Sequence, residues 1–173
     1  MRHSSLALTA FLLSLAFVSP ANATFSVTNT NADGSVTSGA YPSFELTGGD
    51  NGSGEPGSTV YSDIFASDGI MTFDWSYFST DDPSFDSAGY ILNGVETQLA
   101  DTSGEFGTGV AVGINAGDTF GWYVDTTDNL FGPGVLTVDA AFTPSVPEPI
   151  TLALFGAGLS GIVALRRRRK SKT

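Results

Sequence analysis

The sequence predicts an all-β domain, an antiparallel β-sandwich of the jelly-roll-like kind, between two specialised ends. Apolar side chains alternate with polar ones over short stretches, and turn residues separate these stretches. No stretch shows the 3.6-residue apolar period of a convincing helix within this part of the chain. The part from 24 to 145 has about 120 residues, which is the usual size of one domain. We therefore expect one sandwich there.

The first 23 residues have the organisation of a secretory signal peptide. Arg2 supplies a positive charge, and an apolar run follows at 6–18. Ala21 and Ala23 then place small side chains at the two positions that a signal peptidase reads. Thirteen residues span only ~20 Å as a helix, which is too short to cross a hydrocarbon core ~30 Å thick. We expect the mature chain to begin at Thr24.

Short alternating segments follow, and the earliest candidate strands are at 24–28, 43–47 and 59–65. The clearest alternation comes next, with apolar side chains on one face of a strand and polar side chains on the other. The apolar set is Met71, Phe73, Trp75 and Tyr77, and the polar set is Thr72, Asp74 and Ser76.

The second half of the domain is expected to form hairpins. Asn93-Gly94 separates apolar segments at 90–92 and 95–99, and it predicts a two-residue turn because both residues tolerate a positive φ. The last strands are expected at 110–114, 120–124 and 136–142, with a turn at 115–118. Eight to ten short strands at this spacing favour two packed sheets.

The charged residues are distributed unequally along the chain. Seventeen of the eighteen Asp and Glu residues lie between 24 and 145, where the sequence has no Lys, Arg, His or Cys. This composition excludes a Ser-His-Asp triad, a cysteine nucleophile and a Schiff-base lysine, so we expect no enzyme activity. It also disfavours nucleic acid as a partner. A glycosidase, which needs only two carboxylates ~5–9 Å apart, stays open as an alternative.

Two acidic clusters are candidates for calcium binding, because hard cations bind several carboxylate oxygens. One follows the strand of Trp75 and the other follows the strand of Trp122. If the two connections meet at one end of the sandwich, they would share an ion. The alternative is that these acids form a solvated surface. The candidate ligands are Asp81, Asp82 and Asp86 in the first cluster and Asp125 and Asp128 in the second.

The C-terminus, 146–173, has three parts in a fixed order. A proline-rich motif at 146–149 is followed by an apolar segment at 150–165, which makes a transmembrane helix of ~24 Å, and by a basic cluster at 166–172. The basic cluster stays on the cytoplasmic side, so the acidic domain faces outward. The motif is Val146, Pro147, Glu148 and Pro149, and the residues that set the topology are Arg166, Arg167, Arg168 and Arg169.

This order of motif, apolar helix and arginine run resembles the PEP-CTERM sorting tail of Gram-negative surface proteins. The resemblance implies that an exosortase, an integral-membrane cysteine protease, recognises 146–149 and cuts near it. It also implies passage through an inner-membrane intermediate, with the domain in the periplasm, to the cell surface or extracellular matrix. Segment 73–142 more loosely resembles a β-sandwich common among such substrates, which implies architecture and delivery and no activity.

From these features we expect a structural or adhesive protein of an exopolysaccharide matrix or biofilm, with the exopolysaccharide as a partner. The alternative is a calcium-dependent carbohydrate-binding module, and the glycosidase comes third. The negative charge of the domain favours a neutral glycan over an anionic one unless divalent ions bridge the two. Exposed aromatic side chains are candidates for a sugar platform, namely Tyr61, Tyr123 and Phe131.

Overall fold

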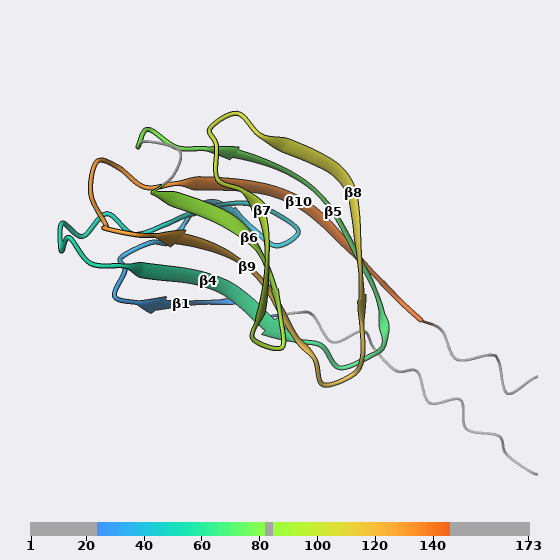
Figure 1. Ribbon diagram of the computed structural model, residues 1–173. Helices are drawn as coiled ribbons and strands as arrows, with labels where there is room; N and C mark the ends of the chain where they lie inside the picture. The colour runs from blue at the N-terminus through green and yellow to red at the C-terminus, as the bar shows by residue number, and fades with distance from the viewer. Residues whose placement is uncertain (1–23, 82–84, 146–173) are drawn as a thin grey trace, which may run out of the picture.

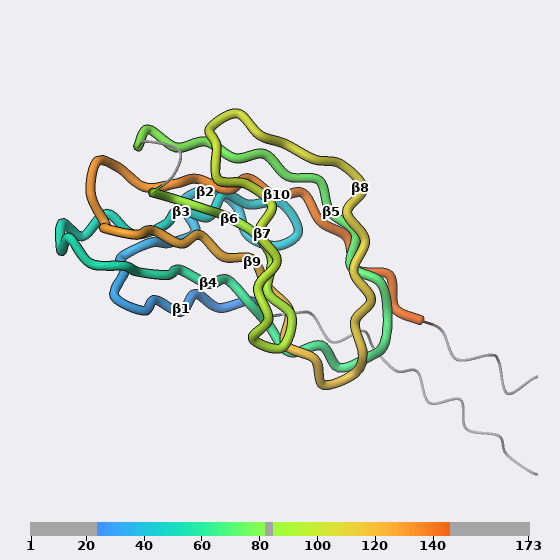
Figure 2. Tube along the Cα trace, viewed as in Figure 1, coloured from blue at the N-terminus to red at the C-terminus, as the bar shows by residue number. Residues whose placement is uncertain are grey.

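The structure is a computed structural model that describes residues 24–81 and 85–145. The described residues form two five-stranded antiparallel sheets that lie face to face (Figures 1 and 2), which confirms the predicted β-sandwich. Sheet A has the order β1 (Ser26–Thr30), β4 (Gly57–Ile64), β9 (Thr119–Thr126), β6 (Asp86–Leu92) and β7 (Val95–Ala100). Sheet B has the order β2 (Val36–Ala40), β3 (Ser43–Thr47), β10 (Val135–Pro144), β5 (Gly69–Phe78) and β8 (Phe106–Ile114).

Aromatic side chains fill the space between the two sheets. Trp122 of β9 is fully buried, and its ring lies 5.1 Å from that of Phe44 and 5.6 Å from that of Phe73, both in sheet B. The alternation predicted for β5 is confirmed, because Met71, Phe73 and Tyr77 are buried and Trp75 packs against the core. Truncating an aromatic core side chain of this kind typically costs about 3–5 kcal/mol.

The predicted turns are confirmed, whereas one strand was missed. Asn93 and Gly94 join β6 to β7 with φ values of 53° and 79°, as a two-residue hairpin requires. The Asp118 N–H donates to the Asn115 carbonyl over 3.0 Å in the turn between β8 and β9. Strand β2 was not predicted, because it is a largely exposed edge strand without alternating apolar side chains.

The two ends of the sandwich differ in their connections. One end, which we call the turn end, has the short connections 41–42, 65–68, 93–94 and 115–118. The opposite end, which we call the loop end, has the longer connections 31–35, 48–56, 79–85, 101–105 and 127–134. The described chain begins and ends at the turn end (Figure 1).

One terminus of the described chain is bound to the end of β4, and the other is bound to the connection that follows β4. The backbone N–H of Thr24 donates to Oδ2 of Asp63 over 2.5 Å. The backbone N–H of Ser145 donates to the carbonyl of Asp68 over 2.8 Å. Both ends of the described chain are therefore held by hydrogen bonds at the turn end.

Across 24–81 and 85–145, no helix has the length and apolar character needed to cross a membrane. The expected signal peptide with Ala21 and Ala23, the expected transmembrane helix at 150–165 and the basic cluster with Arg166 to Arg169 lie outside the described residues. The motif at 146–149 also lies outside them.

Candidate functional site

The connections that carry the predicted acidic clusters meet at the loop end. The backbone N–H of Thr127 donates to the carbonyl of Phe85 over 2.8 Å, which joins the connection after β9 to the start of β6. The hydroxyl of Thr80 donates to the carbonyl of Phe131 over 3.3 Å. These contacts bring the two connections together at one end of the sandwich, which is the condition that a shared ion requires.

Asp86 is the buried centre of this region. It is the first residue of β6, it is only 2% exposed, and its Oδ2 accepts a 2.9 Å hydrogen bond from the Ser79 hydroxyl. The Ser79 oxygen in turn accepts from the backbone N–H of Asp81 over 3.1 Å. Within the described part of the chain, Oδ1 of Asp86 and the hydroxyl of the buried Tyr77 have no hydrogen-bond partner. Buried polar atoms without a partner are costly and require an explanation.

The electrostatics of this region favour a cation or a bound proton. Burial raises the pKa of the Asp86 carboxyl above its ordinary value of 3.8; the hydroxyls of Ser79 and Thr126 oppose the rise, and the charges of Asp81 and Asp128 add to it. Burial, followed by the charge of Asp86, raises the pKa of the Tyr77 hydroxyl. No basic side chain exists between 24 and 145 to neutralise these acids.

Asp125 is separated from the other candidate calcium ligands. It belongs to β9 and not to a connection as predicted, and its side chain points to the outer face of sheet A because successive strand residues face opposite sides. Burial raises its pKa, and a hydrogen bond with Ser58 opposes the rise. Asp81, Asp86 and Asp128 thus lie together at the loop end, whereas Asp125, paired with Ser87 near the same end, faces the outer side of sheet A. Asp82 lies outside the described residues.

The fit of these residues to calcium is incomplete. Among the described residues, no group of three or more His, Cys, Asp or Glu side chains is placed to hold a metal ion. The unpartnered Oδ1 of Asp86 is an oxygen of the type that calcium prefers. Asp81 and Asp128 are close enough to influence the titration of Asp86.

Asn129 fixes three loops of the loop end to one another. It is fully buried, and its side-chain Nδ2 donates to the carbonyl of Asn31 over 3.0 Å and to that of Glu55 over 2.7 Å. Its backbone carbonyl accepts from the N–H of Gly52 over 2.9 Å. The φ of 55° at this residue suits Asn, which tolerates the left-handed region. The loop surface is therefore held in one arrangement.

Several phenylalanine side chains are exposed at the loop end. Phe131 is 77% exposed and has a φ of 65°, which is unfavourable for a bulky residue, and Phe106 is 74% exposed. Phe106 pairs with Ser76, so Phe78 is its diagonal cross-strand neighbour. Among the residues that the structure describes, the exposed phenylalanines at this end are Phe78, Phe85, Phe106 and Phe131.

Two of the three expected platform residues are wrong. Tyr61 is 6% exposed and packs in the core at 4.9 Å from Phe44, so it is not available to a sugar. Tyr123 is 3% exposed on the outer face of sheet A, where its ring lies beside Gly89. Burial, then the charges of Asp125 and Glu96, raise the pKa of Tyr123 to about 12. Alternation along a strand shows which rings face outward, but it does not show which of these rings are covered by neighbouring side chains.

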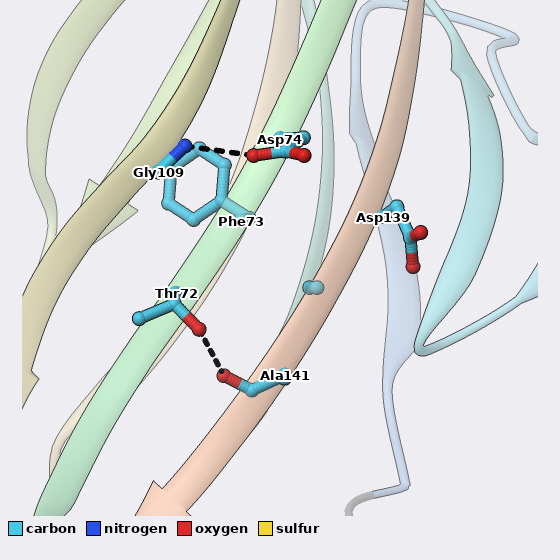
Figure 3. A pocket seen from close by; sticks show the side chains of 7 residues that line it. Thr72, Phe73, Asp74, Gly109, Asp139 and Ala141 are labelled. Carbon is cyan, nitrogen blue, oxygen red and sulfur yellow. Dashed lines mark hydrogen bonds between the residues drawn. The ribbon is translucent and has the colours of Figure 1, made fainter.

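A second acidic feature lies on the outer face of sheet B (Figure 3). Asp74 of β5 and Asp139 of β10 stand directly opposite each other and line a groove of about 290 Å³. Oδ1 of Asp74 accepts a 2.7 Å hydrogen bond from the N–H of Gly109, which has a φ of 66° beside the β-bulge of β8. Like charges at opposed positions destabilise a sheet. Their pairing could not be predicted without the strand register.

The tail matches a known family. The family model described as PEP-CTERM protein-sorting motif matches residues 145–169. No curated protein matches the sequence. The match begins at the last described residue, Ser145, and it covers the motif, the apolar segment and most of the basic cluster.

Solved structures resemble the sandwich only distantly. The secreted serine protease VesC from Vibrio cholerae matches at 11% identity and a TM-score of 0.40, over 61% of this chain and 22% of that one. A family 35 carbohydrate binding module from Clostridium thermocellum matches at 16% identity and 0.37, over 65% and 90%. A CBM35 from Paenibacillus barcinonensis matches at 16% and 0.36, over 70% and 99%. TM-scores this low support no argument about function.

Proposed function

We propose, from the PEP-CTERM protein-sorting motif at residues 145–169, that the sandwich has a structural and adhesive role in an extracellular exopolysaccharide matrix or biofilm. The sorting motif implies export through a membrane-anchored intermediate and processing by an exosortase. The final location at the surface or in the matrix, and the adhesive role of the sandwich, are our proposal. We also propose that the protein is not an enzyme.

The position of the termini supports this proposal. The backbone N–H of Ser145 is bound to the carbonyl of Asp68 at the turn end, and the tail motif starts at the next residue, Val146. While the tail holds the protein at a membrane, the turn end lies nearest to that membrane. The loop end lies at the opposite end of the sandwich (Figure 1) and is therefore presented outward.

The single observation that carries the adhesive role is Phe131. A bulky residue with a φ of 65° stores conformational strain, and a 77% exposed ring gains little from burial to offset it. Strained residues of this kind concentrate at functional positions. An exposed aromatic ring can stack on the apolar face of a sugar, and the surrounding negative charge favours a neutral glycan.

The test compares Phe131→Gly with wild-type protein. Glycine adopts the positive φ without strain, so we expect an unchanged or higher melting temperature together with roughly tenfold weaker binding to a neutral matrix polysaccharide. Val95→Ala is the matched control, because Val95 is an exposed apolar residue at the turn end. Immobilised cellulose and mannan serve as neutral probes, and alginate serves as the anionic probe. Equal binding by all three proteins would contradict the proposal.

A second candidate function is a calcium-dependent carbohydrate-binding module. It is supported by the unpartnered Oδ1 of the buried Asp86, by the nearby charges of Asp81 and Asp128, and by the lack of any base in this part of the chain. Millimolar calcium should raise the melting temperature of wild-type protein at neutral pH. Asp86→Asn should abolish this rise, whereas Asp125→Asn should retain it because Asp125 faces the outer side of sheet A. A melting temperature indifferent to calcium excludes this candidate.

A further inference from the structure

The N-terminal backbone nitrogen of the sandwich lies against a carboxylate. The nitrogen of Thr24 is 2.5 Å from Oδ2 of Asp63, and the two residues are 39 positions apart in sequence. Cleavage of the expected signal peptide after Ala23 converts this amide nitrogen into an α-ammonium group. A charge-assisted hydrogen bond is roughly twice as strong as a neutral one.

Both partners of this contact are held by other interactions. Asp63 presents Oδ2 to Thr24 while its Oδ1 accepts a 2.8 Å hydrogen bond from the N–H of Ile64. Phe25, the next residue after Thr24, stacks on Tyr41 at 4.8 Å and lies 5.6 Å from Trp122. Because Phe25 is packed among core rings, the position of the preceding nitrogen is set by the fold. The entropy cost of forming the contact is therefore small.

The charge distribution gives this contact particular weight. Between 24 and 145 the sequence has seventeen carboxylates and no Lys, Arg or His. An α-ammonium group at Thr24 is then the only cationic group of this stretch. A signal-peptide cut one residue earlier or later would place the ammonium away from Asp63, because Phe25 fixes the register.

We propose that Asp63 is a receptor for the mature N-terminus, and that signal-peptide removal after Ala23 stabilises the sandwich by creating an ion pair between the Thr24 ammonium and the Asp63 carboxylate. The precursor keeps an amide at this position and lacks the pair, so it is the less stable form. This inference rests on the export that the proposed function includes. Its ligand is the chain's own processed amine, and no other partner is required.

The absence of lysine from 24 to 145 permits a selective test. The exported and processed protein is isolated from exosortase-containing cells, and its N-terminus is read by mass spectrometry and sequencing. Acetylation of the folded protein, followed by hydroxylamine to reverse any tyrosine esters, then neutralises the α-amine. Mass spectrometry verifies that one acetyl group is present. The melting temperature is compared before and after acetylation at low salt and at 1 M salt.

We expect acetylation to lower the melting temperature of wild-type protein by about 2–4 °C at low salt and by less at 1 M salt. Asp63→Asn keeps the acceptor for the Ile64 N–H, so it should fold, and acetylation should not change its melting temperature. Asp139→Asn, which removes a carboxylate from sheet B, should respond to acetylation as wild-type protein does.

Two results would overturn the inference. One is a mature N-terminus at a residue other than Thr24. The other is an equal response, or no response, of wild-type and Asp63→Asn proteins to acetylation. An exported protein that begins at Thr24 but shows the second result refutes the ion pair and leaves the proposed function intact. Failure of the proposed function is detected separately, as an unprocessed C-terminus or an absence of matrix binding.

Discussion

The side-chain amide of Asn129 donates a 2.7 Å hydrogen bond to the backbone carbonyl of Glu55, across 74 residues of sequence. The second hydrogen of the same amide is donated to the carbonyl of Asn31. One buried side chain thus connects the β1–β2, β3–β4 and β9–β10 loops. The proposed adhesive surface therefore needs little ordering when it binds, which limits the entropy cost of association.

Asn129→Asp should strongly destabilise the loop end. The substitution keeps the shape and tolerance for a positive φ but replaces the donor with a carboxylate oxygen that faces two carbonyl groups. We expect a loss of about 2–3 kcal/mol in the free energy of unfolding, measured by urea denaturation. Asn51→Asp is the matched control, since Asn51 also donates to the Asn31 carbonyl, over 3.1 Å, but at an exposed position. Similar losses in the two variants would contradict the role given to Asn129.

The parts of the fold that depend on local sequence patterns, such as strand alternation and turn residues, could be predicted from the sequence. Alternation located the core face of β5, and Asn93-Gly94 located the tightest hairpin because both residues adopt a positive φ. Strand β2 carries no such pattern, because an exposed edge strand of five residues with Gly39 needs no apolar face. Its position depends on pairing with β3, which is a tertiary interaction.

The candidate site was only partly predictable for a related reason. Acid clusters after two strands could be identified from the sequence, but only the structure shows that the connections that carry them meet. The burial of Asp86 and the separation of Asp125 depend on where each strand begins and ends, which sequence patterns locate least well. The role of Asn129 depends on contacts 74 and 98 residues away, and only its type and place in a turn-rich segment pointed to it.

The stability of the domain should rise as the pH falls from 8 toward about 4. Burial raises the pKa of Asp86 in the folded state above its ordinary value of 3.8, so protonation of Asp86 favours the folded state. This contribution to the free energy of unfolding is fully present below pH 3.8 and is lost as the pH rises through the folded-state pKa. The pKa values of Glu96 and Asp125 are also raised, mainly by burial, and act in the same direction. Hydrogen bonds from Asn93 and Asn115 lower the pKa of Asp118, so it stays ionised over this range.

Melting temperatures of wild-type and Asp86→Asn proteins at pH 5 and pH 8 test this prediction. The wild-type protein should melt higher at pH 5, and Asp86→Asn should show a smaller difference between the two values. Asp139→Asn controls for the loss of one negative charge. If the melting temperature of Asp86→Asn differs between pH 5 and pH 8 by as much as that of the wild-type protein, Asp86 does not contribute to the pH dependence.

Asp139→Asn should stabilise the sandwich. The substitution removes one of two carboxylates that face each other across β5 and β10, and we expect a gain of about 0.2–1 kcal/mol, larger at low salt. Glu45→Gln is the control, because Glu45 lies on the neighbouring strand β3 opposite Thr137 and not opposite another acid. A destabilised Asp139→Asn protein would argue against repulsion at this pair. The glycosidase alternative makes a different prediction for this pair of acids. The wild-type protein would hydrolyse a neutral glycan, and the Asp74→Asn variant would not.

Insertion of four Gly and Ser residues between Ser145 and Val146 should accelerate processing of the tail. The hydrogen bond from the Ser145 N–H to the Asp68 carbonyl ties the chain to the folded body one residue before the motif, so we expect the body to limit the access of a membrane protease. Pulse-chase labelling in exosortase-containing cells measures the rate, and the same insertion in the exposed Asn93-Gly94 hairpin is the control. Equal rates in the wild-type and tail-insertion proteins would show that the folded body does not obstruct access.

The terminal masses of the protein, recovered from cells with and without the exosortase, test the central proposal most directly. With the exosortase, we expect a secreted or surface form that begins at Thr24 and lacks the basic cluster at 166–172. Without it, we expect a form that begins at Thr24, retains the basic cluster at 166–172 and sediments with the inner membrane. Identical C-termini in the two strains, or a cytosolic chain that retains Met1, would contradict the account.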